Sequence, residues 1–198
     1  MDDFKKRMWE DYHQIIPLSL EIYEDVFRSL ILKKIKKGII IKQPGTADGV
    51  SRYLCEGFIG EYVYVNGEYV LEQIFQPTDT VFDDSSFYPQ IKTDVFLKAL
   101  SDVVFLEFSK ESELMVIKKS RELNRLSHFV IHRLTERKSN LNRIRLKRLE
   151  KGYPDLLKEY PGVETVLTQS DIASFFASSV RSVARLQAKL KKEDNGSE

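Results

Sequence analysis

The feature of this 198-residue sequence that most restricts its fold lies near the C-terminus, where the pattern is typical of two helices joined by a tight turn. Thr168 is followed three residues later by Asp171, a spacing that can cap the start of a helix. The inner face of this first helix would carry Ile172, Phe175 and Phe176, with the small Ala173 where two helices must cross. These positions predict a helix that begins directly after Thr168.

A second helix is predicted directly after a turn at residues 177–179. Ser179 can cap this helix, and Val183, Leu186 and Leu190 recur at three and four residues, so one side would be buried. The side chains left to face outward are Val180, Arg181, Ala184, Arg185 and Lys189. The pattern indicates a helix-turn-helix, in which the start of the second helix meets base edges in the major groove of DNA. The alternative is an ordinary helical hairpin that packs on the rest of the chain.

The composition permits one large or two modest domains, because 42 % of the residues are hydrophobic. No run approaches the roughly 20 apolar residues that cross a bilayer, and the N-terminus lacks the apolar core of a signal peptide. We therefore expect a cytoplasmic protein with no membrane partner. The single cysteine, Cys55, cannot form an internal disulfide and is expected to be a buried structural thiol.

The net charge of +1 conceals a strong asymmetry along the chain. Residues 1–44 carry a net charge of +2, residues 45–113 carry −9, and residues 114–198 carry +8. A basic C-terminal segment that also contains the helix-turn-helix pattern is expected of a protein that binds the phosphate backbone. The alternative is a solvated helix face, because charges of both signs alternate between Arg133 and Lys158.

Three zones follow one another along the sequence. Residues 1 to about 34 are predicted to be helical, on the spacing of Phe4, Met8, Tyr12 and Ile15 and of Ile22, Val26 and Leu30 after Ser19. Residues 35–108 are predicted to form short strands, with a hairpin turn at Asn66-Gly67 as the strongest signal. This regular spacing suggests a sandwich or jelly roll. From Ser109 onward the chain is predicted to be helical again.

An apolar stripe marks a long basic helix in this last zone, at Leu123, Leu126, Val130, Ile131 and Leu134. We interpret the stripe as a dimer seam, since two-fold helix-turn-helix proteins bind half-sites about 34 Å apart. The alternative is packing of the stripe against the sheet. His128 and His132 lie four residues apart, as paired metal ligands can. Because no cysteine or third histidine is near, we expect a structural or solvated role and no metal.

The order of these parts resembles that of the Crp/Fnr family of bacterial transcription regulators. The residues that fall on the family's pattern are Thr168, Ile172, Ala173, Ser179, Val183, Arg185, Leu186 and Leu190, supported by Lys36-Lys37-Gly38 and the Pro44-Gly45 turn. Residues 148–157 resemble members from the Bacteroidetes. The resemblance implies an α+β fold: a β jelly-roll domain like those that bind cyclic nucleotides (1–119), a dimerisation helix and hinge (120–138), and a C-terminal winged helix-turn-helix domain (139–198).

The resemblance also implies roles for residues of the C-terminal domain. Arg185 matches an arginine that reads a base, and an arginine bonded to guanine through two hydrogen bonds is the commonest specific contact. The expected DNA-binding set is Thr168, Gln169, Ser179, Val180, Arg181, Ser182, Arg185 and Lys189, in which the hydroxyl and amide groups would meet phosphates. The implied partners are double-stranded DNA, a second copy of the chain and RNA polymerase. The family commonly has a polar residue at Val180 and a glycine at Ala177.

The sensor domain departs further from the family's pattern. Nucleotide-binding members grip the ribose with a Gly-Glu pair and the phosphate with an arginine, whereas no arginine occurs here between Arg52 and Arg121. The corresponding candidate pocket residues are Phe82, Asp83, Asp84, Ser85 and Lys92. Two adjacent aspartates beside an anionic ligand are unfavourable, and a lysine lacks the arginine fork. We therefore expect no cyclic AMP binding, and the sequence names no other effector.

No enzyme is indicated, because the sequence contains no glycine-rich phosphate loop and no set of residues typical of nucleophilic catalysis. Two functions remain open. The first is a dimeric regulator that binds specific DNA sequences. The second is a small-molecule-binding or protein-interaction module that has lost DNA binding.

Overall fold

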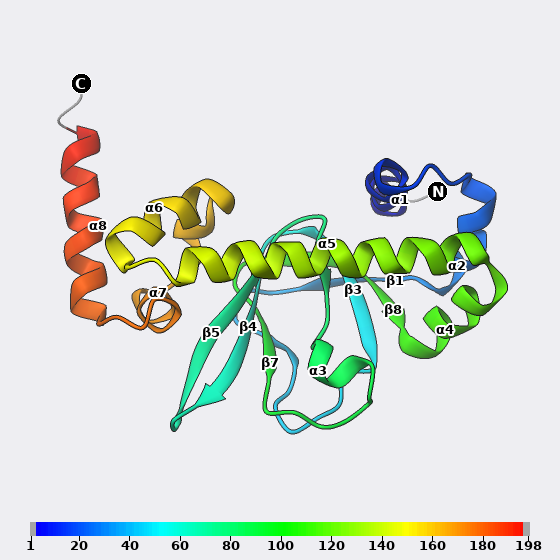
Figure 1. The fold of residues 1–198 in the computed structure, drawn as a ribbon, viewed down its shortest axis with the longest axis horizontal. Helices are drawn as coiled ribbons and strands as arrows, with labels where there is room; N and C mark the ends of the chain where they lie inside the picture. Colours follow the sequence, from blue (N-terminus) through cyan, green and yellow to red (C-terminus); the bar gives the residue numbers. More distant parts are fainter. Residues whose placement is uncertain (1–2, 196–198) are drawn as a thin grey trace.

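A computed structural model describes residues 3–195, with side chains described as far as Lys192 (Figure 1). Its helices are α1 (Asp3–Ile15), α2 (Glu24–Ser29), α3 (Asp84–Phe87), α4 (Lys110–Lys119), α5 (Arg121–Arg145), α6 (Leu149–Glu159), α7 (Gln169–Phe175) and α8 (Val180–Asn195), with short 3-10 helices η1 (Leu20–Tyr23) and η2 (Val163–Thr165). Its strands are β1 (Ile31–Ile35), β2 (Ile40–Lys42), β3 (Val50–Glu56), β4 (Ile59–Val65), β5 (Glu68–Phe75), β6 (Thr80–Val81), β7 (Phe96–Ala99) and β8 (Val103–Ser109). None of the helices in this range is long and apolar enough to cross a membrane.

The strands form two antiparallel four-stranded sheets, in the orders β1-β8-β3-β6 and β2-β7-β4-β5. The core between them contains side chains from both sheets: Leu54, Ile59, Phe75, Val81, Leu97, Ala99, Val103 and Phe105. Along β3 and β8, neighbouring residues such as Tyr53 and Leu106 point the other way, toward α1 and α5. This is the jelly-roll part of the expected α+β fold.

The β4–β5 hairpin turns at Asn66 and Gly67, as the sequence predicts. Both residues have positive φ, 51° and 93°, the backbone of the two-residue turn that matches strand twist. The register pairs Val65 with Glu68 on either side of the turn. Local turn chemistry therefore determines this hairpin.

The first zone is not helical to its end, because residues 31–35 form β1. The sequence predicted helix as far as about residue 34. Instead, Ile31 pairs with Glu107 and Ile35 with Val103, so β1 is an edge strand on β8. β-branched isoleucines favour such a strand once a pairing partner exists, and that partner lies some 70 residues away in the sequence.

The long helix α5 runs from the end of the molecule near α2 and α4 to α6 and α7 in Figure 1, and it is longer than the 120–138 segment expected. Its start is capped by Ser120, whose Oγ accepts a hydrogen bond of 3.1 Å from the Leu123 amide. The apolar stripe faces inward: Leu123 and Leu126 pack with α1 and α2, and Leu134 packs with Phe82 and Phe87. The prediction that this stripe forms a dimer seam is therefore wrong for Leu123, Leu126 and Leu134, which the chain's own sensor domain covers, whereas Ile131 is 37 % exposed.

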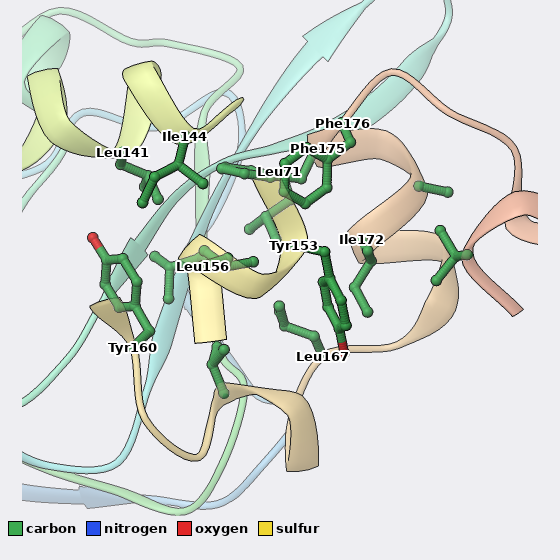
Figure 2. Close-up of a cluster of buried hydrophobic side chains, with 14 of the residues drawn as sticks. Leu71, Leu141, Ile144, Tyr153, Leu156, Tyr160, Leu167, Ile172, Phe175 and Phe176 are labelled. Atoms are coloured by element: carbon green, nitrogen blue, oxygen red, sulfur yellow. The ribbon is translucent and has the colours of Figure 1, made fainter. Parts of the chain in front are cut away.

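The C-terminal helices share one core with the β4–β5 hairpin (Figure 2). The cluster joins Leu71 of β5 to α5, α6, α7 and α8, and its labelled members include Leu141, Ile144, Tyr153, Leu156, Ile172, Phe175 and Phe176. Gly152 of α6 lets the Phe176 ring and the end of α5 lie close to the α6 backbone. A Cβ added at this position would lie 2.4 Å from a ring carbon of Phe176 and 2.8 Å from the Ile144 carbonyl oxygen. No strand follows β8 within residues 3–195, so the described C-terminal helices carry no wing.

Candidate nucleic-acid interface

The start of α7 is fixed by a reciprocal pair of hydrogen bonds. Thr168 Oγ1 accepts from the Asp171 amide at 3.1 Å, and Asp171 Oδ2 accepts from the Thr168 amide at 2.9 Å. Two of the free amides at the helix start are thereby satisfied. Ile172 and Phe175 are buried below, as their spacing predicts.

The turn between α7 and α8 has a left-handed residue, Ala177, with φ of 47°. The Ser178 amide donates to the Ala173 carbonyl at 2.8 Å, which closes the end of α7. Ser179 Oγ then accepts a 3.1 Å hydrogen bond from the Ser182 amide and caps α8. The predicted helix, turn and second helix are all present in this order.

The outward face of α8 is basic. Val183 is buried against α7, which leaves Arg181, Arg185 and Lys189 exposed along one side, and Val180 is 45 % exposed at the start. Residues 180–192 contain five basic and no acidic side chains. A cationic row at this spacing on one helix matches the electrostatic requirement for contact with a phosphate backbone.

The remaining residues of the expected DNA-binding set have structural partners. The hydroxyls of Thr168, Ser179 and Ser182 all take part in helix caps. Gln169 Nε2 donates to Gln187 Oε1 at 3.0 Å, and Gln187 in turn donates to the Tyr153 hydroxyl at 3.2 Å. The structure thus brings the eight residues together on α7, α8 and the segments that precede them, with the cations among the exposed side chains.

Two sets of residues escaped the sequence analysis. Lys191 and Lys192 extend the exposed basic end of α8, and their charge run was the signal that could have identified them.

Tyr62 of β4 donates a 2.8 Å hydrogen bond to Asp171 Oδ1, and the Leu71 amide donates to Ser174 Oγ at 3.2 Å. Burial, and then the nearby Asp171 charge, raise the pKa of Tyr62, so its hydroxyl keeps the proton that it donates. These contacts fix α7 on the hairpin.

The sensor domain holds a buried ionic network where the resemblance placed a phosphate. Lys42 Nζ lies 3.1 Å from Asp83 Oδ2, and both side chains are 2 % exposed. The Asp83 amide donates to Asp48 Oδ2 at 3.0 Å, and Arg52 binds both oxygens of Asp48 at 3.1 Å. Each charge in this network has an opposite charge beside it, as buried charges require.

The candidate pocket residues are divided by this network. Phe82, Asp84 and Ser85 line a cavity of about 400 Å³ against α5, where Lys138 Nζ pairs with Asp84 Oδ2 at 2.7 Å. Asp83 is buried outside that cavity, and Lys92 is exposed away from it. The described residues bring no three histidine, cysteine, aspartate or glutamate side chains together as a metal site.

Comparison with known proteins identifies the fold. No protein-family model matches the sequence, and no curated protein sequence is similar to it. Several solved structures are similar over most of their length. The c-di-GMP responsive global regulator CLP of Xanthomonas campestris is 13 % identical with a TM-score of 0.64, covering 89 % of this chain and 93 % of that one.

Two further structures are similar to the same extent. FixK2 of Bradyrhizobium japonicum is 10 % identical with a TM-score of 0.66, covering 83 % of this chain and 86 % of its own. A protein from Eubacterium rectale assigned to the Crp/Fnr family of transcriptional regulators is 19 % identical with a TM-score of 0.64. The match covers 89 % of this chain and 85 % of that one. The chain therefore has the fold of Crp/Fnr regulators, and the expected α+β fold class is confirmed, apart from the wing, which the described C-terminal helices do not carry.

Proposed function

We propose that this protein is a dimeric transcription regulator that binds specific DNA sequences through α8. The observation that carries the proposal is the row of exposed cations, Arg181, Arg185 and Lys189, on a helix held by a capped turn. Arg185 lies between the other two cations and would reach a base edge, while the helix start would meet phosphates. The parts proposed are a sensor (1–119), the connecting helix α5 (Arg121–Arg145) and a DNA-binding region after it (146–198), because α5 continues past the expected boundary at 138.

Selection of bound duplexes from a random library tests this function directly. Enrichment of a palindrome is expected, because two copies would bind two half-sites. Arg185→Ala should then weaken binding to that site about 5- to 150-fold, equivalent to about 1–3 kcal/mol, and relax preference at one position of each half-site.

Two further variants separate the roles. Ser179→Ala should weaken binding to every sequence alike, because a phosphate contact carries no base information. Lys33→Ala removes an exposed charge from β1, distant from α8, and should leave binding unchanged. An Arg185→Ala protein that keeps full discrimination would contradict base reading by this helix.

The dimer seam belongs on the outer face of α5, because the inner face is covered. Phe129 is 42 % exposed there, with the Arg125 guanidinium 5.8 Å from its ring centre. Phe129→Asp is expected to shift the protein toward monomer in sedimentation. Leu20→Asp, which changes a side chain of equal exposure on η1, should not.

The proposed regulator does not use cyclic AMP. Asp83 and Lys42 neutralise each other within the sheet sandwich, and opening them to admit a phosphate would leave a buried charge unpaired. Calorimetric titration should show no site at micromolar concentrations, and a stoichiometric micromolar site would contradict this.

One observation favours the second function. The exposed Val180 stands where a base-reading residue is usually polar. If the library yields no enriched sequence, a protein-interaction role for this apolar position replaces the DNA-binding proposal. RNA polymerase contact stays a prediction.

A further inference from the structure

A second cavity lies outside the jelly-roll core. It measures about 120 Å³, is partly open to solvent, and lies between α1, α2, α4, α5 and the face of the β1-β8-β3-β6 sheet that carries Tyr53 and Leu106. An apolar cavity of about 150 Å³ holds one benzene ring; this space is slightly smaller, so part of a single-ring ligand would extend through its open side. It lies on the other side of the sheet from the Leu54 and Phe105 core.

Six aromatic side chains line this cavity, together with aliphatic ones. The aromatic ones are Tyr12, Tyr23, Tyr53, Phe82, Tyr88 and Phe108. The negative faces of aromatic rings attract a cation within about 6 Å of the ring centre, and the attraction grows when water is excluded. The same rings provide apolar contact for a ligand ring.

Glu113 of α4 is the one acidic residue on the described wall, and no lysine, arginine or histidine of residues 3–192 lines it. Ser51 Oγ donates a 3.0 Å hydrogen bond to Glu113 Oε2. Burial raises the pKa of Glu113, because its charge has little solvent around it, and the Ser51 hydrogen bond and the positive charge of Lys110 offset part of this rise. No salt bridge joins Lys110 and Glu113 among the described residues; the Lys110 ammonium donates to the carbonyls of Phe87 and Tyr88.

We propose that this cavity binds a small organic amine, in which a single ring fills the aromatic space and an ammonium group pairs with Glu113. The ligand would supply a direct ion-pair partner, which Lys110 does not form with this carboxylate. An anionic ring compound of the same size is excluded by the same charge. This binding does not depend on whether α8 recognises DNA.

Titration of the full chain with three matched probes tests the proposal. Benzylamine should bind one-to-one and saturably, benzyl alcohol about tenfold more weakly, and benzoate not at all. The tenfold factor is the lower end expected for a hydrogen bond to a charged group. Backbone amide signals of α4 and α5 in nuclear magnetic resonance spectra should move during the benzylamine titration.

Paired variants assign the effect to one carboxylate. Glu113→Gln should lower benzylamine affinity about tenfold and leave benzyl alcohol within about twofold, because the substitution keeps the shape and removes the charge. Glu111→Gln removes an exposed charge from the same helix, outside the cavity, and should change neither affinity.

A third variant tests the location. Ser127→Phe places a ring in the cavity from α5 and should abolish binding of both probes. Equal binding of benzoate and benzylamine, absence of saturable benzylamine binding, or an unchanged benzylamine affinity in Glu113→Gln would each overturn the proposal.

Discussion

Ala177 lies in the turn between α7 and α8, and its backbone has the left-handed conformation, which glycine adopts more easily than alanine. A left-handed backbone costs a residue with a Cβ about 1 kcal/mol. Ala177→Gly should therefore raise the free energy of unfolding by up to about 1 kcal/mol, measured by urea denaturation. Ala188→Gly, on the exposed face of right-handed α8, should lower it by about the same amount. Destabilisation by both substitutions would contradict the strain at Ala177.

Glu61 gives the stability of the protein a dependence on pH. Burial raises the pKa of this carboxyl from 4.5 to about 8, and Oε2 has no hydrogen-bond partner among the described residues. Between those two values the folded state holds a proton that the unfolded state has lost, so unfolding free energy falls as pH rises, by up to about 1.4 kcal/mol per unit. Glu61→Gln should flatten the curve between pH 5 and 8. Glu68→Gln, in the exposed part of β5, should leave its slope unchanged.

At the scale of the element, α7 is held by the β4–β5 hairpin through Tyr62. Tyr62→Phe keeps the ring, which is stacked on Phe96 at 4.6 Å, and removes only the hydrogen bond to Asp171. Amide hydrogen exchange in α7 should accelerate about tenfold, as expected for loss of about 1.5 kcal/mol, while exchange in β1 and β8 stays constant. Tyr64→Phe removes an exposed hydroxyl from the same strand and is the control. Unchanged exchange in α7 would mean that apolar packing alone holds the helix.

At the scale of the whole molecule, the shared core around Leu71, Tyr153 and Phe175 makes the C-terminal helices part of one folding unit. Calorimetry should show one unfolding transition, with equal calorimetric and van't Hoff enthalpies. A fragment of residues 139–198 should lack stable helix in circular dichroism, because it loses the apolar contacts of β4 and β5. Two separate transitions, or a folded fragment, would contradict this.

The sequence predicted the parts of this molecule whose cause is local. The cap at Thr168, the turn after Phe176 and the Asn66-Gly67 hairpin each depend on neighbouring residues. The identity of β1, the direction of the α5 stripe and the Tyr62–Asp171 contact depend on partners between about 50 and 110 residues away. A single sequence shows that a helix has an apolar face. It does not show whether another subunit or the chain's own sheet domain covers that face.

Because Gly152 lets α5, α6 and α7 pack closely, a movement of α5 would be passed on to the other two helices. With no side chain at Gly152, the end of α5 and the ring of Phe176 both lie directly against the backbone of α6, and the packing leaves little free space between the three helices. The 25 residues of α5 span about 37 Å, so the helix is a stiff lever with its far end at the aromatic cavity. A tilt of about 5° at that end would move the tip beside α6 by about 3 Å, a sizeable step against the spacing of adjacent bases.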